Sequence, residues 1–242
     1  MGSAERTRAF LLRSVDFGEA DRIVTLFTET VGKVSVMARG ARSSRRRFGG
    51  ALEPFSLIDV EVAPGRGQLD RLSAARIERP FVRLLGRLTH MREGGYALEA
   101  IRALLPERQP EPRLFTALID FIGALDAPEC ATPRQLKLGL LVQAIAVMGF
   151  APQLDRCGVC KRAPTHEQAV QLHPARGYIV CRSCGGARVL LSGRTRALWS
   201  GLTSEGWLLA ASTPWPDQQV AQVSDALKPL LECNLERSVS FV

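Results

Sequence analysis

Four of the six cysteines stand in two close pairs, and their spacing is the clearest sign of chemistry in this 242-residue sequence. Cys157 pairs with Cys160 and Cys181 with Cys184, which gives the pattern C-x2-C-x20-C-x2-C. Two residues between cysteines allow a tight turn to direct both thiolates at one ion, and two such turns complete a tetrahedron. Four thiolates leave no open coordination position. The spacing therefore predicts one structural Zn²⁺ per chain, without a catalytic role.

A redox dithiol, a pair of disulfides and an iron–sulfur cluster are the alternatives for the same residues. The first two are rare inside cells, and clusters usually show other spacings. Between the two pairs, Val170–His173 and Tyr178–Val180 are typical of short strands that could pair around Pro174–Gly177. Metal binding would supply on the order of 10 kcal/mol toward folding so small a segment. We therefore predict a zinc-binding module at residues 153–190.

A second group of residues could bind an anionic polymer. From Thr30 to Leu52 the sequence has no acidic residue, although the chain as a whole carries 24 of them against 32 basic ones. Phosphates recur along a nucleic acid, so that each cation of such a block can meet one. The alternative is a solvated loop whose charge has no function. The basic residues of this block are Lys33, Arg39, Arg42, Arg45, Arg46 and Arg47.

Residues 156–196 are also basic, with eight Lys and Arg against Glu167 as the one acid. Part of this charge could offset the net −2 of a zinc tetrathiolate. It could equally extend a nucleic-acid surface, and the sequence leaves both alternatives open.

No catalytic motif accompanies these groups. Gly32-Lys33 does not end a phosphate loop, because Phe27 stands where the first glycine belongs and Val34 where a Ser or Thr belongs. A G-x-S-x-G elbow and the H-x-E with P-C-x-x-C pattern of zinc deaminases are both missing from the sequence. We therefore predict that the protein is not an enzyme. A metal-dependent enzyme is the weaker alternative.

The elements that must position these residues begin with a β module over residues 1–80. Five short apolar or alternating segments are separated by turn-forming sequences, a pattern typical of a small closed barrel of the OB or SH3 kind. The expected strands lie within residues 10–12, 22–27, 34–37, 58–62 and 69–77.

Beyond Pro80 the apolar period becomes helical. Gly94-Gly95 predicts a break in the first helical stretch, and Pro112 and Thr132-Pro133 predict helix starts. Helical patterning resumes at Thr195 and at Asp217. We therefore expect an α-helical domain over residues 81–242 that is interrupted by the zinc module. The three tryptophans in this part are expected to be packing anchors. They are Trp199, Trp207 and Trp215.

No run of about 18 apolar residues is present, and residues 1–6 lack the apolar stretch of a secretory signal. These observations favour a soluble intracellular protein without a membrane partner.

Taken in order, the sequence resembles the RecO family of bacterial DNA repair proteins. The resemblance rests on Gly18–Thr28, Gly32-Lys33, Ala38–Arg42, the stretch from Ser44 to Phe55, Gly149–Pro152 before the first cysteine pair, and Gly177 before the second. It covers nearly the whole chain. It implies an α+β multidomain protein with an N-terminal five-stranded OB-type barrel over residues 1–80, a central and C-terminal α-helical domain, and a four-cysteine zinc-finger insertion.

The resemblance also implies a function. Members of this family bind single- and double-stranded DNA, anneal complementary strands, act with RecR to load RecA, and contact the C-terminal tail of single-strand-binding protein. By resemblance, Lys33, Arg39 and Arg42 would contact DNA, with Arg45, Arg46 and Arg47 as helpers, in the bacterial cytoplasm at the nucleoid. Some members lack the cysteines, which places the shared activity outside the zinc site.

Few aromatic residues stand near the basic block. Phe27, Phe48 and Phe55 are the candidates for base stacking, and their small number favours electrostatic contact with the DNA backbone. The alternative function, from another class, is an adaptor that recruits partners through its helical domain and binds nucleic acid only incidentally.

Overall fold

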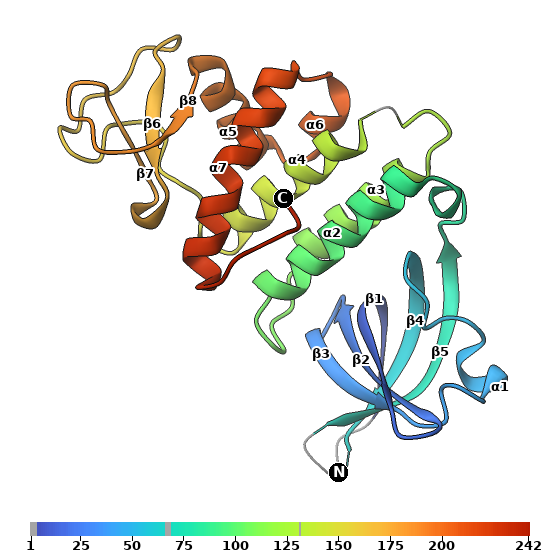
Figure 1. Cartoon of the computed structure of the whole chain (residues 1–242). Coiled ribbons are helices and arrows are strands. Elements are labelled where there is room, and N and C mark those ends of the chain that lie inside the picture. Colours follow the sequence, from blue (N-terminus) through green and yellow to red (C-terminus); the bar gives the residue numbers. More distant parts are fainter. Residues whose placement is uncertain (1–3, 66–68, 131) are drawn as a thin grey trace. The chain divides into compact units, whose positions relative to one another are not determined.

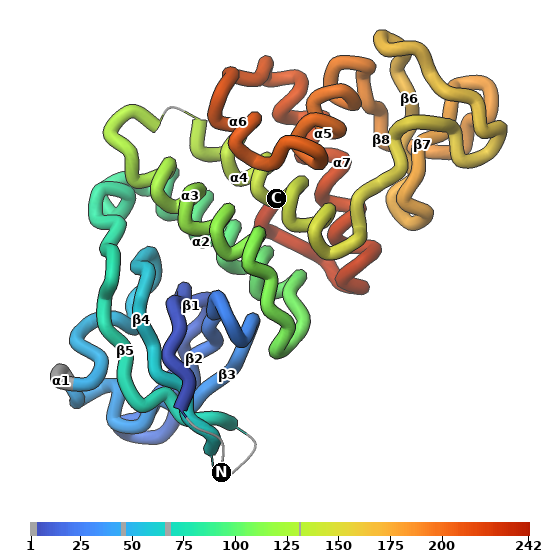
Figure 2. The backbone as a smooth tube through the Cα atoms, turned by 180° about the vertical axis from the view of Figure 1, so that it is seen from behind, coloured from blue at the N-terminus to red at the C-terminus, as the bar shows by residue number. Residues whose placement is uncertain are grey.

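A computed structural model describes residues 4–65, 69–130 and 132–242, and for Arg45 and Arg46 the backbone alone. The chain forms two compact units, Met1–Cys130 and Ala131–Val242. Figures 1 and 2 show that the first unit holds a barrel and two long helices, and the second a helical bundle with a small sheet. The division predicted at residue 80, with a module at 153–190, stays a prediction.

The predicted five-stranded barrel is confirmed. Its strands close in the order β1-β2-β3-β5-β4, and all neighbours are antiparallel except β3 and β5. The short helix α1 (Arg45–Phe48) lies in the connection between β3 and β4. This topology is that of an OB-type barrel. The strands are β1 (Glu5–Phe17), β2 (Asp21–Thr28), β3 (Gly32–Ala38), β4 (Ser56–Ala63) and β5 (Asp70–Pro80).

The long strand β1 contains an irregularity, and its side chains pack both inside the barrel and in an aromatic cluster outside it. The register against β2 shifts between Leu11 and Arg13, which marks a β-bulge at Leu12. Before the bulge, Leu11 faces the barrel interior and Phe10 the opposite side, and both are buried. After the bulge, every residue from Arg13 to Phe17 is exposed. The bulge thus decides which side chains of the β1–β2 hairpin face outward.

Helices α2 (Leu88–Leu104) and α3 (Pro112–Asp126) complete the first unit. Phe115 of α3 packs against Phe10 of β1 and Phe27 of β2, with ring centroids 5.9 and 5.3 Å apart. Phe81, which follows β5, lies 6.3 Å from Phe10. One side of the barrel is therefore covered by an aromatic cluster. The predicted first-turn position of Pro112 is confirmed.

The break predicted at Gly94-Gly95 is wrong, because α2 runs through both glycines. A Cβ on Gly94 would overlap the ring of Phe55. The glycine therefore permits close packing of α2 on the barrel connection, and the helix is stabilised by that contact in spite of the low helix propensity of glycine.

The second unit packs α5 (Gly193–Glu205), α6 (Leu208–Ser212) and α7 (Asp217–Leu235) around α4 (Pro133–Val147). A three-stranded sheet in the order β7-β6-β8 adjoins α7. The three tryptophans of this unit are buried, as expected of packing anchors. Its strands are β6 (Val170–His173), β7 (Tyr178–Val180) and β8 (Val189–Leu191).

Among the helices of the described ranges, none combines the length and the apolar composition that crossing a bilayer requires.

Candidate nucleic-acid interface and metal centre

The four paired cysteines come together at one point of the second unit. Their sulfur atoms all lie within 4.8 Å of one another, and the Sγ atoms of Cys160 and Cys181 are 3.8 Å apart. A tetrahedron with metal–sulfur bonds of about 2.3 Å has edges of about 3.8 Å. The donor set and its dimensions therefore fit a tetrahedral thiolate-binding ion, and the cluster could hold one.

Local structure explains why each pair forms a turn. Lys161 adopts a left-handed backbone with φ of 62° just after the first pair, and Gly185 one with φ of 59° just after the second. The Gly158 N–H donates to the Ile179 carbonyl of β7 at 2.8 Å, and a Cβ on Gly158 would overlap the Tyr178 ring. The predicted hairpin of β6 and β7 thus packs against the first turn and holds it by this hydrogen bond.

The electrostatics of the cluster favour thiolate at its buried side. Burial alone would raise the pKa of Cys157, but backbone N–H groups, foremost those of Cys160 and Cys181, lower that pKa to about 6. Hydrogen bonds with Cys184 lower the pKa of Cys181. Hydrogen bonds with Cys181 and Cys160 raise the pKa of Cys184 to about 12. The backbone N–H groups thus favour the thiolate form of Cys157, and thiolate is the form that ligates a metal.

The basic residues around the cysteines are all exposed. Several have local partners: Arg156 pairs with Asp155 at 3.1 Å, and Arg176 donates to the Tyr178 hydroxyl at 2.9 Å. Both sequence alternatives for this charge, an offset to the metal site and a nucleic-acid surface, stay predictions. The residues are Arg156, Lys161, Arg162, Arg176, Arg182 and Arg188.

In the first unit, most of the predicted DNA contacts lie in the β3–β4 loop, residues 39–55. Arg39, Arg42 and Arg47 are exposed there. The Arg47 guanidinium donates to the Arg39 carbonyl at 2.7 Å and stacks on Phe48, and Arg42 donates to the Glu19 carbonyl at 3.0 Å. These contacts join Arg42 and Arg47 to neighbouring groups while both side chains stay exposed. The side chains of Arg45 and Arg46 lie outside the described part of the structure.

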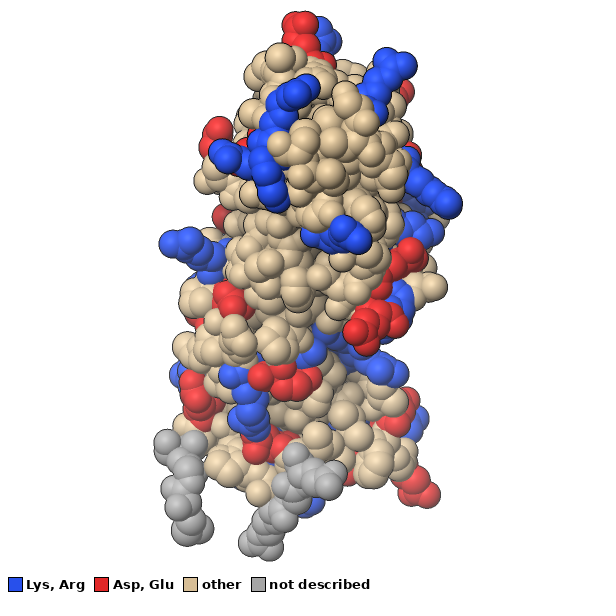
Figure 3. Space-filling model, turned by 90° about the vertical axis from the view of Figure 1, so that its left-hand side faces the viewer, with Lys and Arg blue, Asp and Glu red and all other residues tan. Residues whose placement is uncertain are grey.

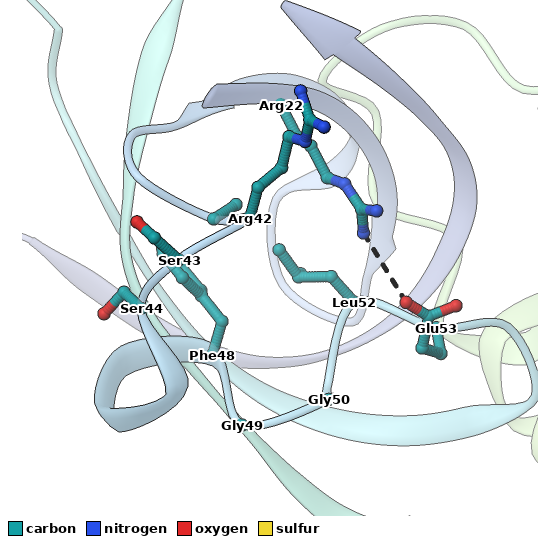
Figure 4. A pocket seen from close by; sticks show the side chains of 10 residues that line it. Arg22, Arg42, Ser43, Ser44, Phe48, Gly49, Gly50, Leu52 and Glu53 are labelled. Atoms are coloured by element: carbon teal, nitrogen blue, oxygen red, sulfur yellow. Dashed lines mark hydrogen bonds and ion pairs between the residues drawn. The ribbon is translucent and has the colours of Figure 1, made fainter. Parts of the chain in front are cut away.

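A pocket of about 210 Å³ opens beside this loop. Arg22 of β2 and Arg42 line it, and Figure 4 shows Ser43 and Ser44 on the side away from Glu53. The Arg22 guanidinium lies between two carboxylates, 3.0 Å from Asp16 and 3.5 Å from Glu53. The Arg42 guanidinium and the hydroxyls of Ser43 and Ser44 also line this opening, and such donors suit a phosphate group. Sequence reasoning did not single out Arg22, although it belongs to the Gly18–Thr28 stretch that carries the family resemblance.

Lys33 does not lie with the arginines. It stands near the start of β3, six residues from Arg39, which is a separation of about 20 Å along an extended strand. Its ammonium donates to the Arg102 carbonyl in the last turn of α2 at 3.1 Å and pairs with Glu107 at 3.3 Å. Its side chain is 13% exposed. The structure thus makes Lys33 a cap on the C-terminus of α2.

We expect Lys33→Met to lower the free energy of unfolding by about 1–2 kcal/mol, because the C-terminus of α2 loses its cation and the Arg102 carbonyl loses its hydrogen-bond donor. Denaturant unfolding measures this loss. The same variant tests the predicted role in DNA binding. If the slope of log affinity against log salt becomes shallower by about 0.7, Lys33 contacts a phosphate. We expect an unchanged slope.

Some of the surface cations of this protein are paired with carboxylates. Figure 3 shows Lys and Arg side chains intermingled with Asp and Glu on one face. In the barrel, Arg8 pairs with Glu29 at 2.6 Å, and these contacts lower the pKa of Glu29. Arg6 likewise pairs with Asp59. Cations without such partners are therefore the better candidates for binding an external anion.

Two family models match the chain. "Recombination protein O N terminal" matches residues 1–81, and "Recombination protein O C terminal" matches residues 85–240. Proteins named "DNA repair protein RecO" are similar over almost the whole length. The protein from Anaeromyxobacter dehalogenans is 41% identical, over 95% of this chain and 91% of its own. That from Myxococcus xanthus is 36% identical, over 97% and 93%.

A third protein of that name, from a Nocardioides species, is 34% identical over 97% of this chain and 96% of its own. The family models and the similar proteins indicate the same family. The OB-type barrel and the four-cysteine cluster are consistent with it. The chain therefore belongs to the RecO family of DNA repair proteins.

Proposed function

We propose that this chain is a non-catalytic DNA-binding mediator of recombinational repair, which binds single- and double-stranded DNA and anneals complementary strands. The observation that carries the proposal is the exposed arginine cluster of the β3–β4 loop on an OB-type barrel. Membership in a family of DNA repair proteins supports it. The barrel supplies the rigid frame and the loop supplies the charge.

The proposed mechanism is neutralisation of charge. Guanidinium groups at the loop contact phosphates and release the counterions that surround DNA, which makes binding favourable without reference to sequence. The pocket beside the loop, lined by Arg42, Ser43 and Ser44, offers donors for one such phosphate. Two strands held close on the same cationic surface repel each other less, and complementary bases can then pair. No residue needs to form or break a covalent bond.

The partners in the proposal follow from the family. Together with RecR, the protein would promote loading of RecA on DNA coated by single-strand-binding protein, whose C-terminal tail it would contact. The place of action would be the cytoplasm at the nucleoid. The metal is proposed to be one structural Zn²⁺ per chain, held by Cys157, Cys160, Cys181 and Cys184, which would fix the β6–β7 hairpin.

The salt dependence of binding to single-stranded DNA tests this mechanism. Five phosphate contacts, one for each arginine from Arg39 to Arg47, predict a slope of log affinity against log salt near −3.5. Affinity should then fall on the order of 100-fold between about 0.05 and 0.2 M salt. Fluorescence anisotropy of a labelled oligonucleotide measures it. An affinity that hardly changes over this range would contradict the proposal.

A further inference from the structure

The four cysteines of the cluster differ in their access to solvent. Cys160 is exposed and Cys184 is partly exposed, whereas Cys157 and Cys181 are only 1% and 7% exposed. Cys160 ends the first turn, directly before the left-handed residue Lys161. A dissolved oxidant therefore reaches Cys160 before the other three sulfurs.

Cations surround this exposed cysteine. Residues 156–196 carry eight Lys and Arg against one acid. Lys161 and Arg162 follow Cys160 directly, and the Lys161 ammonium donates to a carbonyl of the same turn at 2.8 Å. Within the described ranges, the side chains of Arg162 and Arg182 are exposed and have no hydrogen bond or ion pair. Exposed thiolates in such electropositive surroundings are the reactive class of cysteine.

A second sulfur atom lies within reach of Cys160. Its Sγ is 3.8 Å from that of Cys181, which belongs to the other turn. A disulfide requires the two sulfurs to approach to about 2.05 Å. Cys157 is the less suitable partner, because its sulfur is buried and accepts a hydrogen bond from the Cys181 N–H at 3.4 Å. The geometry therefore favours a bond between the two turns over a bond within the first turn.

We infer that Cys160 is an oxidation site for peroxides, at which formation of a disulfide with Cys181 displaces the metal. The Cys160 thiolate attacks one oxygen of the peroxide, the O–O bond breaks, hydroxide leaves, and the sulfur becomes a sulfenic acid. The Cys181 thiolate then attacks this sulfur and expels the second oxygen as hydroxide. The two thiolates give up one electron each, and the peroxide gains both.

The disulfide would leave too few ligands for the metal. Only Cys157 and Cys184 would retain thiolates, and a structural zinc site needs four ligands. The cluster around the sulfurs contains little other apolar material, since its buried members are Cys157, Val180 and Cys181. Release of the metal therefore unfolds the two turns. The inference rests on the proposed zinc site and adds that peroxide controls its occupancy.

Zinc release and disulfide mapping test the inference together. The zinc-loaded full chain is treated with an equimolar amount of hydrogen peroxide beside a chromogenic chelator, and its disulfides are mapped by mass spectrometry. We expect one zinc to be released for each Cys160–Cys181 disulfide, and a dithiol reductant with added Zn²⁺ to restore the site. Cys233 is exposed as well but lies outside the cluster, so Cys233→Ser should release zinc at the unaltered rate.

Three results would contradict the inference. Zinc that stays bound while Cys233 is oxidised would overturn it and leave the metal site standing. Release that accompanies a Cys157–Cys160 disulfide, or sulfinic acid without any disulfide, would overturn the assigned pair. A protein that binds no zinc would refute the metal site and the inference with it.

The cationic surroundings supply a second test. Arg162→Ala/Arg182→Ala removes two cations and no ligand, so that the zinc content should not change. Its release by peroxide should be roughly two- to fivefold slower at low salt, and the difference should shrink at high salt. Lys228→Ala/Arg237→Ala is the matched control, because these exposed cations lie on and after α7, and it should react at the unaltered rate. Equal low-salt rates in all three proteins would overturn the inference that the surroundings activate this site.

Discussion

Cys181→Ser is expected to abolish metal binding and to unfold residues 157–184, while the barrel of the first unit keeps its fold. Cys181 connects the two turns of the cluster, because its backbone N–H donates to the Cys157 sulfur at 3.4 Å and its own sulfur lies 3.8 Å from that of Cys160. A serine hydroxyl is not a ligand of structural zinc sites. On the order of 10 kcal/mol of metal-linked folding free energy is therefore lost locally.

Elemental analysis and hydrogen exchange together measure this result. We expect one zinc per chain in the unaltered protein, none in Cys181→Ser, and fast exchange of the amides of β6 and β7 in that variant alone. Cys130→Ser and Cys233→Ser are the matched controls, since both residues are cysteines that lie outside the cluster, and they should retain the metal. An unchanged zinc content in Cys181→Ser would refute the assignment.

Replacing the five arginines of the β3–β4 loop by alanine is expected to have the largest effect on DNA binding. The variant carries Ala at positions 39, 42, 45, 46 and 47. Removing five phosphate contacts should make the salt slope shallower by about 3.5 and lower the affinity for single strands on the order of 100-fold at about 0.2 M salt. Strand annealing, which requires two strands on one surface, should be lost as well.

A second variant, also with five Arg→Ala substitutions, controls for the change in net charge. Alanine at positions 156, 162, 176, 182 and 188, around the cysteines, also lowers the net charge from +8 to +3. If the metal-site charge only offsets the thiolates, this variant binds DNA nearly as well as the unaltered protein. An equal loss in both variants would extend the DNA surface to the second unit. Full cellular repair activity in the loop variant would favour the adaptor alternative.

The cysteine cluster could be predicted from the sequence because its determinants are local. Two residues separate the members of each pair, and the β6–β7 hairpin between them spans residues 170–180. The barrel strands were predictable for a similar reason, since β3 and β4 alternate between buried and less buried residues. Patterns of short range survive in a single sequence without any knowledge of what packs against them.

Lys33 shows what such patterns miss. In the sequence it belongs to the acid-free block, but its partners, the Arg102 carbonyl and Glu107, are about seventy residues away. Nothing near Lys33 indicates that the end of α2 approaches it. Composition identified the basic segment, and tertiary contact decided which of its cations stay at the surface.

The outward position of Phe17 could not be predicted from the sequence for a different reason. Strict alternation along β1 would place Phe17 on the same face as Leu11, which is part of the barrel core. The bulge at Leu12 reverses that alternation, and Val15 and Phe17 face outward instead. A bulge depends on how two strands twist around each other, and a single extra residue leaves no signature in the apolar pattern.

The aromatic cluster that joins the barrel to α3 has a practical consequence for dividing this protein into fragments. A fragment that ends with β5 would leave Phe10 and Phe27 without Phe115 and would present them to water on the barrel side that α3 covers. The Lys33 carbonyl, which accepts from the Arg108 N–H at 2.8 Å, would lose its partner too. Exposed aromatic surface beside strand edges promotes aggregation. Recombinant expression of the DNA-binding part is therefore better served by a fragment that continues to residue 130 than by the barrel alone.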